Sequence, residues 1–342
     1  MKRAAKLFEP IVDRDNLRLA VGLAMRGKRD RPAVREFLAH LESNLSAVRE
    51  QLLDGTIRLG EFQQFVIHDP KQRVITAPCF RERVLHHAII NLCEPVFERW
   101  LIDDTFACRR GLGQVVAVKR ARDFASRHEF FVKLDIRKYF DSISHGKLLD
   151  LLARLFKDAR LLDLFARIVR AFRGGMGRGL PIGSLTSQHF ANFYLGWLDR
   201  QIKEQWRIKG YVRYMDDMVL WGNDRSHLRE VAQKAVAFLN DVLDLGTKDE
   251  LRTGRCRRGI DFLGCRVKPD CVTLNRRSRR RFRHKLMALE DSYLDGELDE
   301  ETLQQRATAL LAFTQHEGVS SWKFREHVLQ RCAVSGHKAR TG

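Results

Sequence analysis

The chain has 342 residues, of which 44% are hydrophobic, and carries a formal net charge of +19. This hydrophobic content excludes a disordered chain and predicts a globular protein with a sizeable core. A protein this basic is expected to bind a polyanion, with nucleic acid favoured over an anionic membrane surface. No apolar run approaches the roughly 20 residues that span a bilayer, and Glu9 and Asp13 interrupt any signal-peptide core. We therefore expect a soluble, cytoplasmic protein that does not bind a membrane.

The N-terminal third of the sequence predicts helices on either side of a strand pair. Apolar residues recur at helical spacing after Pro32, which predicts one helix over residues 33–53. The run FQQFVIHDPKQRVITAP predicts two strands around the turn residues Asp69 and Pro70. Residues 81–100 are predicted to be helical, and TFACRRGLGQ, at residues 105–114, is predicted to be a loop.

The following residues alternate short apolar strands with helices. FFVKLDI at residues 130–136 predicts a strand, and helices are expected over 145–156, 161–172 and 186–202, with a glycine-rich loop at 173–184. YVRYMDDMVLWGND predicts a β-hairpin with Met215, Asp216 and Asp217 at or near its tip. An amphipathic helix over 228–242 and a short strand, FLGCRV at 262–267, complete this part.

The composition changes beyond Pro269. The dense basic run RRSRRRFRHK occupies residues 276–285, and two or three helices are expected to follow it. We therefore place a domain boundary near residue 269. The mixed strands and helices before the boundary predict the α+β class, with helices on one face of a sheet.

Three aspartates occur on two of these apolar strands. Asp135 closes FVKLD, and Asp216 and Asp217 lie inside YMDDMVL. Bare carboxylates on an apolar strand are unfavourable unless something pairs with them, and adjacent aspartates also repel each other. Divalent metal removes this difficulty, since Mg²⁺ prefers hard oxygen ligands and substrate phosphates. The alternative is that Asp216 and Asp217 are ordinary turn residues and that Asp135 is a helix cap or a surface charge.

The residues around these aspartates resemble the reverse transcriptase family. LDIRKYFDSI is similar to the first catalytic strand and YMDD to the second catalytic motif, with the glycine-containing GLPIGSLTSQ between them. KQRVITAP resembles the fingers motif and FLGCRV the primer grip. The resemblance implies a right-hand polymerase with an N-terminal segment (1–32), fingers (33–125), a palm (126–268, with fingers elements including the 174–188 loop) and a helical, basic thumb and tail (269–342).

A narrower resemblance concerns the middle motif. Ile182-Gly183 and Ser187-Gln188 stand where most relatives have Gln-Gly and Ser-Pro, which is similar to the reverse transcriptases of diversity-generating retroelements. DDTFACRRGLG and RVLHHAIIN resemble the same subfamily. This resemblance implies an enzyme that copies template-repeat RNA with errors at adenine and acts with a small, basic, oligomeric accessory variability protein. The alternatives are a group II intron-like or phage-defence reverse transcriptase, and an inactive RNA-binding scaffold.

The resemblance also implies roles for individual residues. Two Mg²⁺ ions would be held by Asp135, Ile136, Asp216 and Asp217, with Asp217 in a supporting position. The deoxynucleoside triphosphate would be bound by Lys71, Arg73, Phe140, Ile182, Gly183, Gln188 and Lys248. The RNA template and the RNA–DNA hybrid would be bound by Tyr214, Met215, Leu263, Gly264, Arg276 and Arg280, with Arg109 and Arg110 as a second backbone contact.

Several of these roles have a structural alternative. Phe140 is either the aromatic residue that excludes a 2′-hydroxyl or an ordinary core residue beside Tyr139. Lys71 and Arg73 alternate along one strand and so share a face, which suits a triphosphate or merely solvent. An isoleucine at position 182 supplies only shape, and shape discriminates weakly, by roughly 1–3 kcal/mol. We hypothesise that Ile182 loosens base selection; the alternative is a simple packing residue.

Overall fold

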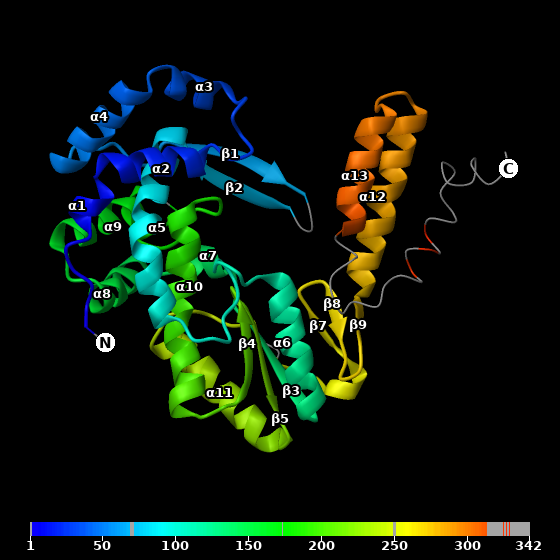
Figure 1. The fold of residues 1–342 in the computed structure, drawn as a ribbon. Coiled ribbons are helices and arrows are strands. Elements are labelled where there is room, and N and C mark those ends of the chain that lie inside the picture. Colours follow the sequence, from blue (N-terminus) through cyan, green and yellow to red (C-terminus); the bar gives the residue numbers. More distant parts are fainter. Residues whose placement is uncertain are drawn as a thin grey trace. The chain divides into compact units, whose positions relative to one another are not determined.

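The computed structural model describes residues 2–68, 72–172, 174–248 and 251–312, together with Phe324, Glu326 and Val328 (Figure 1). Contacts between residues divide the chain into two units. The first unit comprises Met1–Asp103, Asp135–Trp206 and Gln233–Asp249, and the second comprises Asp104–Leu134, Arg207–Ala232 and Glu250–Gly342. Each unit is therefore assembled from segments that are far apart in the sequence.

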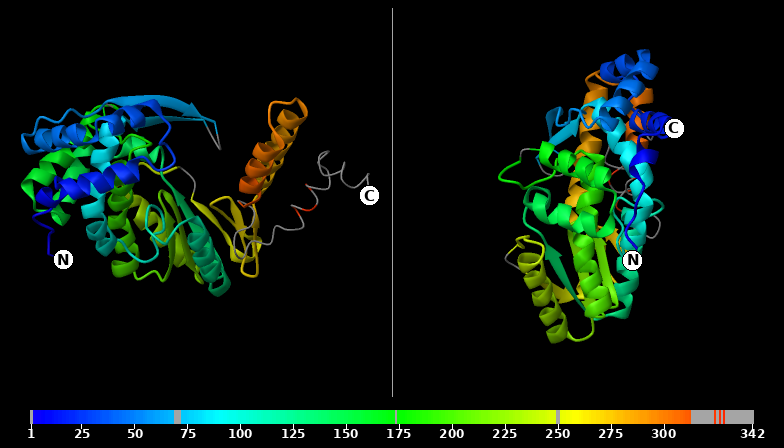
Figure 2. Two further views of the ribbon diagram at one scale, coloured as in Figure 1. Left: turned by 45° about the horizontal axis from the view of Figure 1, so that its top comes forward. Right: turned by 90° about the vertical axis from the view of Figure 1, so that its left-hand side faces the viewer.

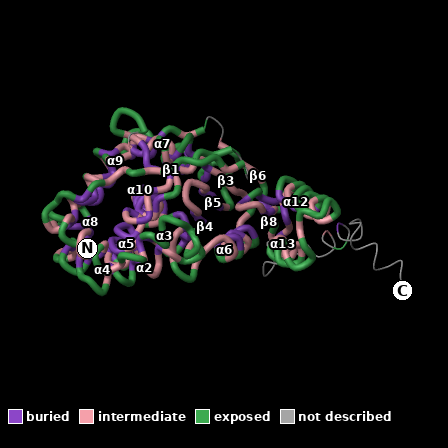
Figure 3. The backbone as a smooth tube through the Cα atoms, turned by 90° about the horizontal axis from the view of Figure 1, so that it is seen from above, coloured by how far each residue is buried: buried purple, intermediate pink, exposed green. Residues whose placement is uncertain are grey.

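The first unit is mainly helical. It contains α1 (Phe8–Ile11), α2 (Arg14–Ala24), α3 (Pro32–Ala39), α4 (Leu41–Leu53), α5 (Phe80–Trp100), α7 (Tyr139–Ser142), α8 (His145–Leu155), α9 (Ala159–Ala171) and α10 (Leu185–Arg200), which continues as a π-helical turn (Gln201–Gln205). Helices α2 and α10 both pack against α5, and α10 is largely buried (Figure 3). Edge-to-face aromatic pairs such as Phe97–Phe156 and Phe165–Phe190 fill this core.

The prediction of one helix over residues 33–53 was wrong, because the helix breaks at His40. The backbone of His40 adopts φ −124° and ψ 40°, which is outside the helical region, so α3 ends at Ala39 and α4 begins at Leu41. The side-chain amide of Asn44 donates a hydrogen bond of 2.9 Å to the carbonyl of Phe37. This bond satisfies one of the carbonyls that the break leaves without a helical partner.

The strand pair predicted after these helices is confirmed. Strands β1 (Phe62–Ile67) and β2 (Arg73–Pro78) form a two-stranded antiparallel sheet in which Phe62 is opposite Pro78. Arg73 is the first residue of β2 and is exposed. Lys71 lies outside the described residues, so the predicted shared face of Lys71 and Arg73 stays a prediction.

The second unit contains a four-stranded sheet in the order β4-β5-β3-β6. Its strands are β3 (Phe130–Asp135), β4 (Gly210–Tyr214), β5 (Asp217–Gly222) and β6 (Arg252–Arg255). The pairs β4–β5 and β3–β6 are antiparallel, and α6 (Gln114–Arg127) packs against β4. The predicted hairpin is confirmed, with Met215 and Asp216 between the strands and Asp217 opening β5. Helix α11 (Arg225–Asp241) follows β5, close to its predicted range.

The segment FLGCRV was predicted as one strand, and that prediction was wrong. It forms a tight turn between β7 (Ile260–Phe262) and β8 (Cys265–Val267), and β9 (Val272–Leu274) completes a three-stranded antiparallel sheet. Leu263 and Gly264 both have positive φ, 48° and 82°, as the two central residues of a type I′ hairpin turn require. This small sheet continues across residue 269.

Two long helices follow the small sheet, as predicted. Helix α12 (Arg276–Leu294) packs against α13 (Glu300–Ala312), and Figure 2 shows them as a helical hairpin. Asn275 caps α12, since its side-chain oxygen accepts a hydrogen bond from the Ser278 amide. The mixture of helices and antiparallel sheets confirms the α+β class, whereas the boundaries assigned to fingers, palm and thumb stay predictions. Within the described ranges, no helix combines the length and the apolar character needed to cross a membrane.

Candidate active site

Asp135 closes strand β3, and the first unit holds it mainly through the backbone. The amide of Lys248 donates to the carbonyl of Asp135 at 3.0 Å, and the amide of Arg137 donates to Gly246 at 2.8 Å. Between them, Ile136 is buried and forms an antiparallel bridge with Thr247. Lys248 Nζ lies 2.6 Å from Asp135 Oδ2. The structure therefore brings two predicted site residues, Asp135 and Lys248, into direct contact.

Asp216 and Asp217 lie on the hairpin of the second unit, which is supported by a buried arginine. Met215 has φ 52°, a left-handed conformation that is uncommon outside glycine. Arg213 is fully buried, and its guanidinium donates to the Met215 carbonyl at 3.0 Å. The backbone of Arg213 also bonds to Asp104 and Phe106. Arg213 thus fixes the turn that carries both aspartates, a role that the sequence did not reveal.

Lys133 is a second site residue that sequence reasoning missed. Its ammonium group lies 2.7 Å from Asp217 Oδ1 and donates to the carbonyl of Asp261 at 3.0 Å. The signal was present in FVKLD, because a residue two positions before Asp135 lies on the same face of a strand. Lys133 therefore connects Asp217 to strand β7.

The donor set suits Mg²⁺ in chemistry. Among the described residues, no three histidine, cysteine, aspartate or glutamate side chains form a ready-made metal cluster. Mg²⁺ does not require one, since it is usually bound by one or two carboxylates together with substrate phosphates. Strand β3 ends at Asp135, strand β5 begins at Asp217, and the two strands are neighbours in the sheet. That the three aspartates together hold two Mg²⁺ ions stays a proposal.

The glycine-containing loop before α10 rests on strand β2. The amide of Thr76 donates to the carbonyl of Ile182 at 2.8 Å. Gly183 has φ 120°, and a Cβ at this position would lie 2.8 Å from Ile75 Cγ2 and 3.1 Å from the Thr76 carbonyl oxygen. Only glycine allows this approach without strain. The structure therefore brings together the predicted nucleotide residues Ile182 and Gly183 and the strand that starts at Arg73.

Buried polar side chains support this loop from α5. Ser184 Oγ lies 3.1 Å from His86 Nδ1 and 3.0 Å from Thr186 Oγ1, and His86 Nε2 lies 3.6 Å from Glu82 Oε1. Desolvation by burial lowers the pKa of His86 to about 3, and the like charges of His87 and Arg83 lower it further. The imidazole is therefore neutral at neutral pH. Burial also raises the pKa of Glu82. These residues fix the loop without an internal charge pair.

The aromatic pair after Asp135 is divided between core and surface. Tyr139 is buried, and its hydroxyl donates to the Ala191 carbonyl at 2.5 Å. Phe140 is partly exposed and packs edge-on against Tyr139, with ring centroids 5.8 Å apart. Of the two, Tyr139 is the core residue, and Phe140 remains partly exposed to solvent.

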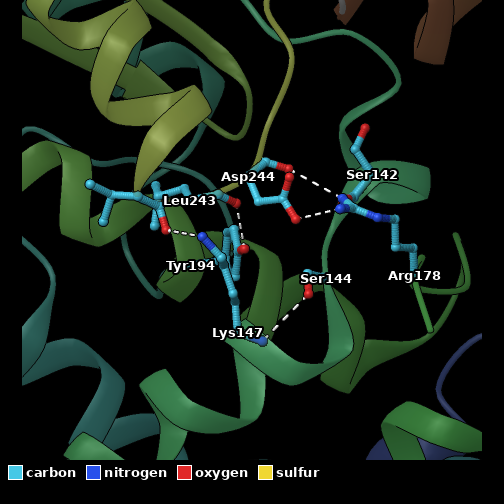
Figure 4. A network of polar contacts seen from close by, with 8 residues as sticks. Ser142, Ser144, Lys147, Arg178, Tyr194, Leu243 and Asp244 are labelled. Carbon is cyan, nitrogen blue, oxygen red and sulfur yellow. Dashed lines mark hydrogen bonds and ion pairs between the residues drawn. The ribbon is translucent and has the colours of Figure 1, made fainter.

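A polar network ties the glycine-rich loop to neighbouring segments. The guanidinium of Arg178 forms an ion pair with Asp244 and donates to the Ser142 carbonyl at 3.1 Å, while Tyr194 donates to Leu243 at 2.6 Å (Figure 4). The network holds residues 142–144, 178 and 243–244 together, close in sequence to Phe140 and Lys248.

The predicted primer-binding residues lie in the second unit. Tyr214 and Leu263 both pack against one hydrophobic cluster that includes residues of α6. The carbonyl of Leu263 accepts a hydrogen bond from Gln114 at 2.7 Å, and that of Gly264 accepts one from Asn275 at 3.0 Å. The Leu263-Gly264 turn is therefore anchored to α6 and to the start of α12.

A basic groove of about 1030 Å³ begins where α12 starts. Ser278, Phe282 and Leu286 form the buried face of α12, so much of the arginine run is exposed. The cationic lining residues are Arg252, Arg266, Arg276, Arg277, Arg279, Arg280 and Arg283. The predicted residues Arg276 and Arg280 thus share one groove. Arg109 and Arg110 lie apart on the loop before α6, where Arg109 donates to the Thr105 carbonyl at 2.7 Å.

Residues 68–267 match the family model described as reverse transcriptase (RNA-dependent DNA polymerase). This range is more than half of the chain, so the chain belongs to the reverse transcriptase family. The predicted family is confirmed, and with it the right-hand polymerase fold that the resemblance implied.

The chain is also similar to individual proteins. Protein YkfC of Escherichia coli (strain K12) is 24% identical over 275 residues, which are 67% of this chain and 72% of YkfC. The group II intron-encoded protein LtrA of Lactococcus lactis subsp. cremoris is 25% identical over 170 residues, 46% of this chain and 28% of LtrA. The chain thus spans less than a third of LtrA. A telomerase from Candida albicans superimposes with a TM-score of 0.43 and 13% identity, covering 80% of this chain and 55% of the telomerase.

Proposed function

We propose that this chain is an RNA-directed DNA polymerase that adds deoxynucleotides by two-metal nucleotidyl transfer. Besides family membership, one observation carries the proposal: β3 closes with Asp135, β5 opens with Asp217, and the two strands are neighbours in one sheet. Asp135 and Asp216 would hold two Mg²⁺ ions with the Ile136 carbonyl, and Asp217 would support them from its contact with Lys133. When bound, such ions would supply the chemistry that activates a primer hydroxyl and stabilises a leaving pyrophosphate.

The other site residues would bind the nucleotide and position it. Lys71 and Arg73 would contact the triphosphate, Gln188 and the Ile182-Gly183 backbone would shape the base pocket, and Phe140 would exclude a 2′-hydroxyl. Lys248 would donate a proton to pyrophosphate from its place beside Asp135. The 2.6 Å contact between Lys248 Nζ and Asp135 Oδ2 puts this ammonium group beside a proposed metal ligand, and hydrogen-bond reach of the leaving pyrophosphate is the further condition for a proton donor.

Template RNA and the RNA–DNA hybrid would be bound by the second unit. Tyr214, Met215, Leu263 and Gly264 would contact the primer, and Arg276 and Arg280 would contact backbone phosphates in the groove of α12. Each phosphate that a cation neutralises adds to the salt dependence of binding. We propose that these reactions take place in the cytoplasm of a bacterium or a phage-infected bacterial cell.

Two lineages remain for the enzyme type. The likeness to LtrA, a group II intron-encoded protein, favours a group II intron-like reverse transcriptase. The residues Ile182-Gly183 and Ser187-Gln188 favour the diversity-generating retroelement type, with its accessory protein, as the second candidate. Replacing Ile182 with Gln and sequencing the cDNA separates the two: the second candidate predicts fewer errors at adenine in the variant, and an unchanged error spectrum argues for the first.

Primer extension with Mg²⁺ tests the proposed activity. Wild type should extend a DNA primer on an RNA template, and Asp216→Ala plus Asp217→Ala should lower the rate by about 10³-fold or more. Asp291→Ala plus Asp295→Ala, which removes two exposed carboxylates of another segment, is the matched control and should extend normally. Extension that survives loss of both hairpin aspartates would refute the mechanism. RNA binding without any extension by wild type would favour the inactive scaffold.

A further inference from the structure

A small cavity of the first unit lies beside the glycine-containing loop that precedes α10, between the start of α10 and α5. Its volume is about 170 Å³. The roughly 300–1,000 Å³ of pockets for drug-sized ligands is larger, so a group the size of one phosphate suits the space better than a whole nucleotide. The cavity is lined by Arg83, His86, His87, Gly183, Leu185 and Gln188.

Basic side chains gather around this cavity. Arg83 and His87 are partly exposed and lie one helical turn apart on α5, so they share a face. Beside them is the loop between α2 and α3, residues 25–31 with the sequence MRGKRDR. One N–H of Arg83 donates to the Ala24 carbonyl at 3.3 Å, which fixes the guanidinium next to this loop.

These basic groups lower one another's pKa values. Burial lowers the pKa of Arg83, and Arg31 lowers it further. Burial, Arg83 and Arg31 lower the pKa of Lys28. Burial also lowers the pKa of His87 to about 4, helped by Arg83, Lys28 and Arg26. The charges that lower these three pKa values belong to Arg26, Lys28, Arg31 and Arg83 and are all cations.

Such a cluster is stabilised by an anion. Like charges that are partly withdrawn from water repel each other, and a bound anion reverses the sign of that interaction. Guanidinium groups present several N–H donors in a fixed plane that matches phosphate oxygens. Glu82 does not serve as this anion, because one of its oxygens accepts from the Gly60 amide at 2.8 Å and the other faces His86.

We propose that this cavity is a phosphate-binding site in which Arg83 and His87 contact the phosphate and Lys28 and Arg31 supply further positive charge. The phosphate belongs either to a nucleic-acid strand that passes Gly183 and Gln188 or to a nucleotide. The proposal rests on the proposed function only in naming a nucleic-acid strand or a nucleotide as the source of the phosphate. The basic residues and the volume of the cavity do not depend on whether the chain is a polymerase.

Binding of a short single-stranded RNA, followed by fluorescence anisotropy over a series of salt concentrations, tests the site. If the phosphate belongs to a nucleic-acid strand, Arg83→Gln should weaken binding about 5- to 10-fold and lower the slope of log K against log salt by about 0.7 per lost phosphate contact. In the same case Lys28→Gln, in a loop and without a role in the core, should weaken binding about 3-fold and guards against a folding defect in the first variant. Arg99→Gln, an exposed arginine of the same helix, is the matched control and should bind as wild type does.

The source of the phosphate is decided by a second measurement. If it belongs to a nucleotide, the KM for deoxynucleoside triphosphate rises about tenfold in Arg83→Gln while RNA affinity stays unchanged. If it belongs to a strand, RNA affinity falls and this KM is unaffected. A variant pair, Arg83→Gln and Lys28→Gln, that matches wild type in both assays would overturn the site.

A direct probe uses inorganic phosphate and needs no catalysis. Phosphate beside His87 favours the imidazolium, so it should raise the His87 pKa above about 4 against the opposing charges of Arg83, Lys28 and Arg26. The NMR resonances of His87 should therefore move with phosphate in wild type and not in Arg83→Gln. Because this readout is independent of primer extension, an inactive enzyme with a responsive His87 would refute the polymerase and leave the phosphate site standing.

Discussion

The two segments that carry the proposed catalytic aspartates are supported in different ways. Asp135 is held by backbone hydrogen bonds to residues 246–248, and its contact with Lys248 is open to solvent, with side chains 44% and 51% exposed. Asp217 contacts Lys133, with side chains only 27% and 17% exposed, and its turn is fixed by the buried Arg213. Both aspartates therefore contact a lysine, but only the second contact is part of the interior.

Because of this difference, substitutions near the two aspartates should affect the stability of the fold and the rate of the reaction to different degrees. An exposed ion pair contributes about 0–1 kcal/mol, whereas removing one partner of a buried charge pair costs about 3–5 kcal/mol. Substitutions near Asp135 should therefore affect the reaction more than the fold. Substitutions near Asp217 should affect both.

The largest effect is expected from the arginine under the hairpin. Arg213→Met removes a fully buried cation and leaves the Met215 carbonyl without its donor, so the free energy of unfolding should fall by about 3 kcal/mol or more. Urea denaturation followed by circular dichroism measures this change, and Arg213→Lys should recover part of it. A midpoint equal to that of wild type would show that Arg213 does not hold the turn.

Lys248→Met removes the ammonium group that contacts Asp135 and should affect catalysis more than stability. We expect kcat to fall about 100-fold, because a proton donor contributes roughly 10²–10⁴-fold, while stability changes by about 0.5 kcal/mol or less. Single-turnover kinetics and urea denaturation of the same preparation provide both values. A loss of stability without a loss of kcat would contradict the expectation that the exposed contact at Asp135 matters for catalysis and not for the fold.

Lys133→Met should combine the two effects. Since the pair with Asp217 is mostly buried, the expected cost lies between the exposed and the buried cases, at about 1–3 kcal/mol. Primer extension should weaken as well, because Lys133 also bonds to the Asp261 carbonyl on β7. Lys133→Arg keeps the charge and is the control. Equal stability of Met and Arg variants would mean that the ion pair contributes nothing.

The smallest effect is expected at Glu82. Its substitution tests whether the buried polar side chains next to the glycine-containing loop make the stability of the protein depend on pH. The pKa of Glu82 is raised in the folded protein, so the folded state holds the proton more tightly than the unfolded chain. Stability from this group is present below its ordinary pKa of 4.5 and is lost as pH rises through the folded pKa. Glu82→Gln should remove this loss and stabilise the protein by about 1 kcal/mol or less at neutral pH.

The control for that experiment lies on the same helix. His86 has a lowered pKa, so its contribution has the opposite sign and is lost as pH falls from 6.5 toward 3. Thermal unfolding of wild type and Glu82→Gln between pH 4 and 8 separates the two groups. Parallel stability curves for both proteins would contradict the assignment to Glu82.

Much of the fold follows from patterns that the sequence displays directly. The apolar arms around YMDD predict the hairpin, and the glycine-rich stretch predicts a loop before α10. Strand β6, RTGR, has no apolar pattern, and it is defined by pairing with β3 instead. The break at His40 depends on one backbone conformation and on a hydrogen bond from Asn44, and neither has a signal in hydrophobic periodicity.

The site was predictable where chemistry fixes the residue type. Aspartates on apolar strands predict a metal, which stays a prediction, whereas the close approach of Gly183 to β2 is seen only in the structure. The supporting residues were harder to predict. The spacing in FVKLD puts Lys133 on the same face as Asp135, but its contact with Asp217 and the place of Arg213 under the hairpin depend on neighbouring strands that the sequence alone does not show. Glu82 and His86 were closer to prediction, since two polar residues four apart in an apolar helix share a buried face.

Iron-directed cleavage most directly tests whether the three aspartates share a pair of ions. With Fe²⁺ in place of Mg²⁺, a reductant and peroxide generate radicals that cut the backbone beside the bound metal. We predict cuts near residue 135 and near residues 216–217 in the same protein, and loss of both sets in Asp216→Ala plus Asp217→Ala. Cuts confined to one of the two segments, or unaffected by the double substitution, would contradict a shared metal site.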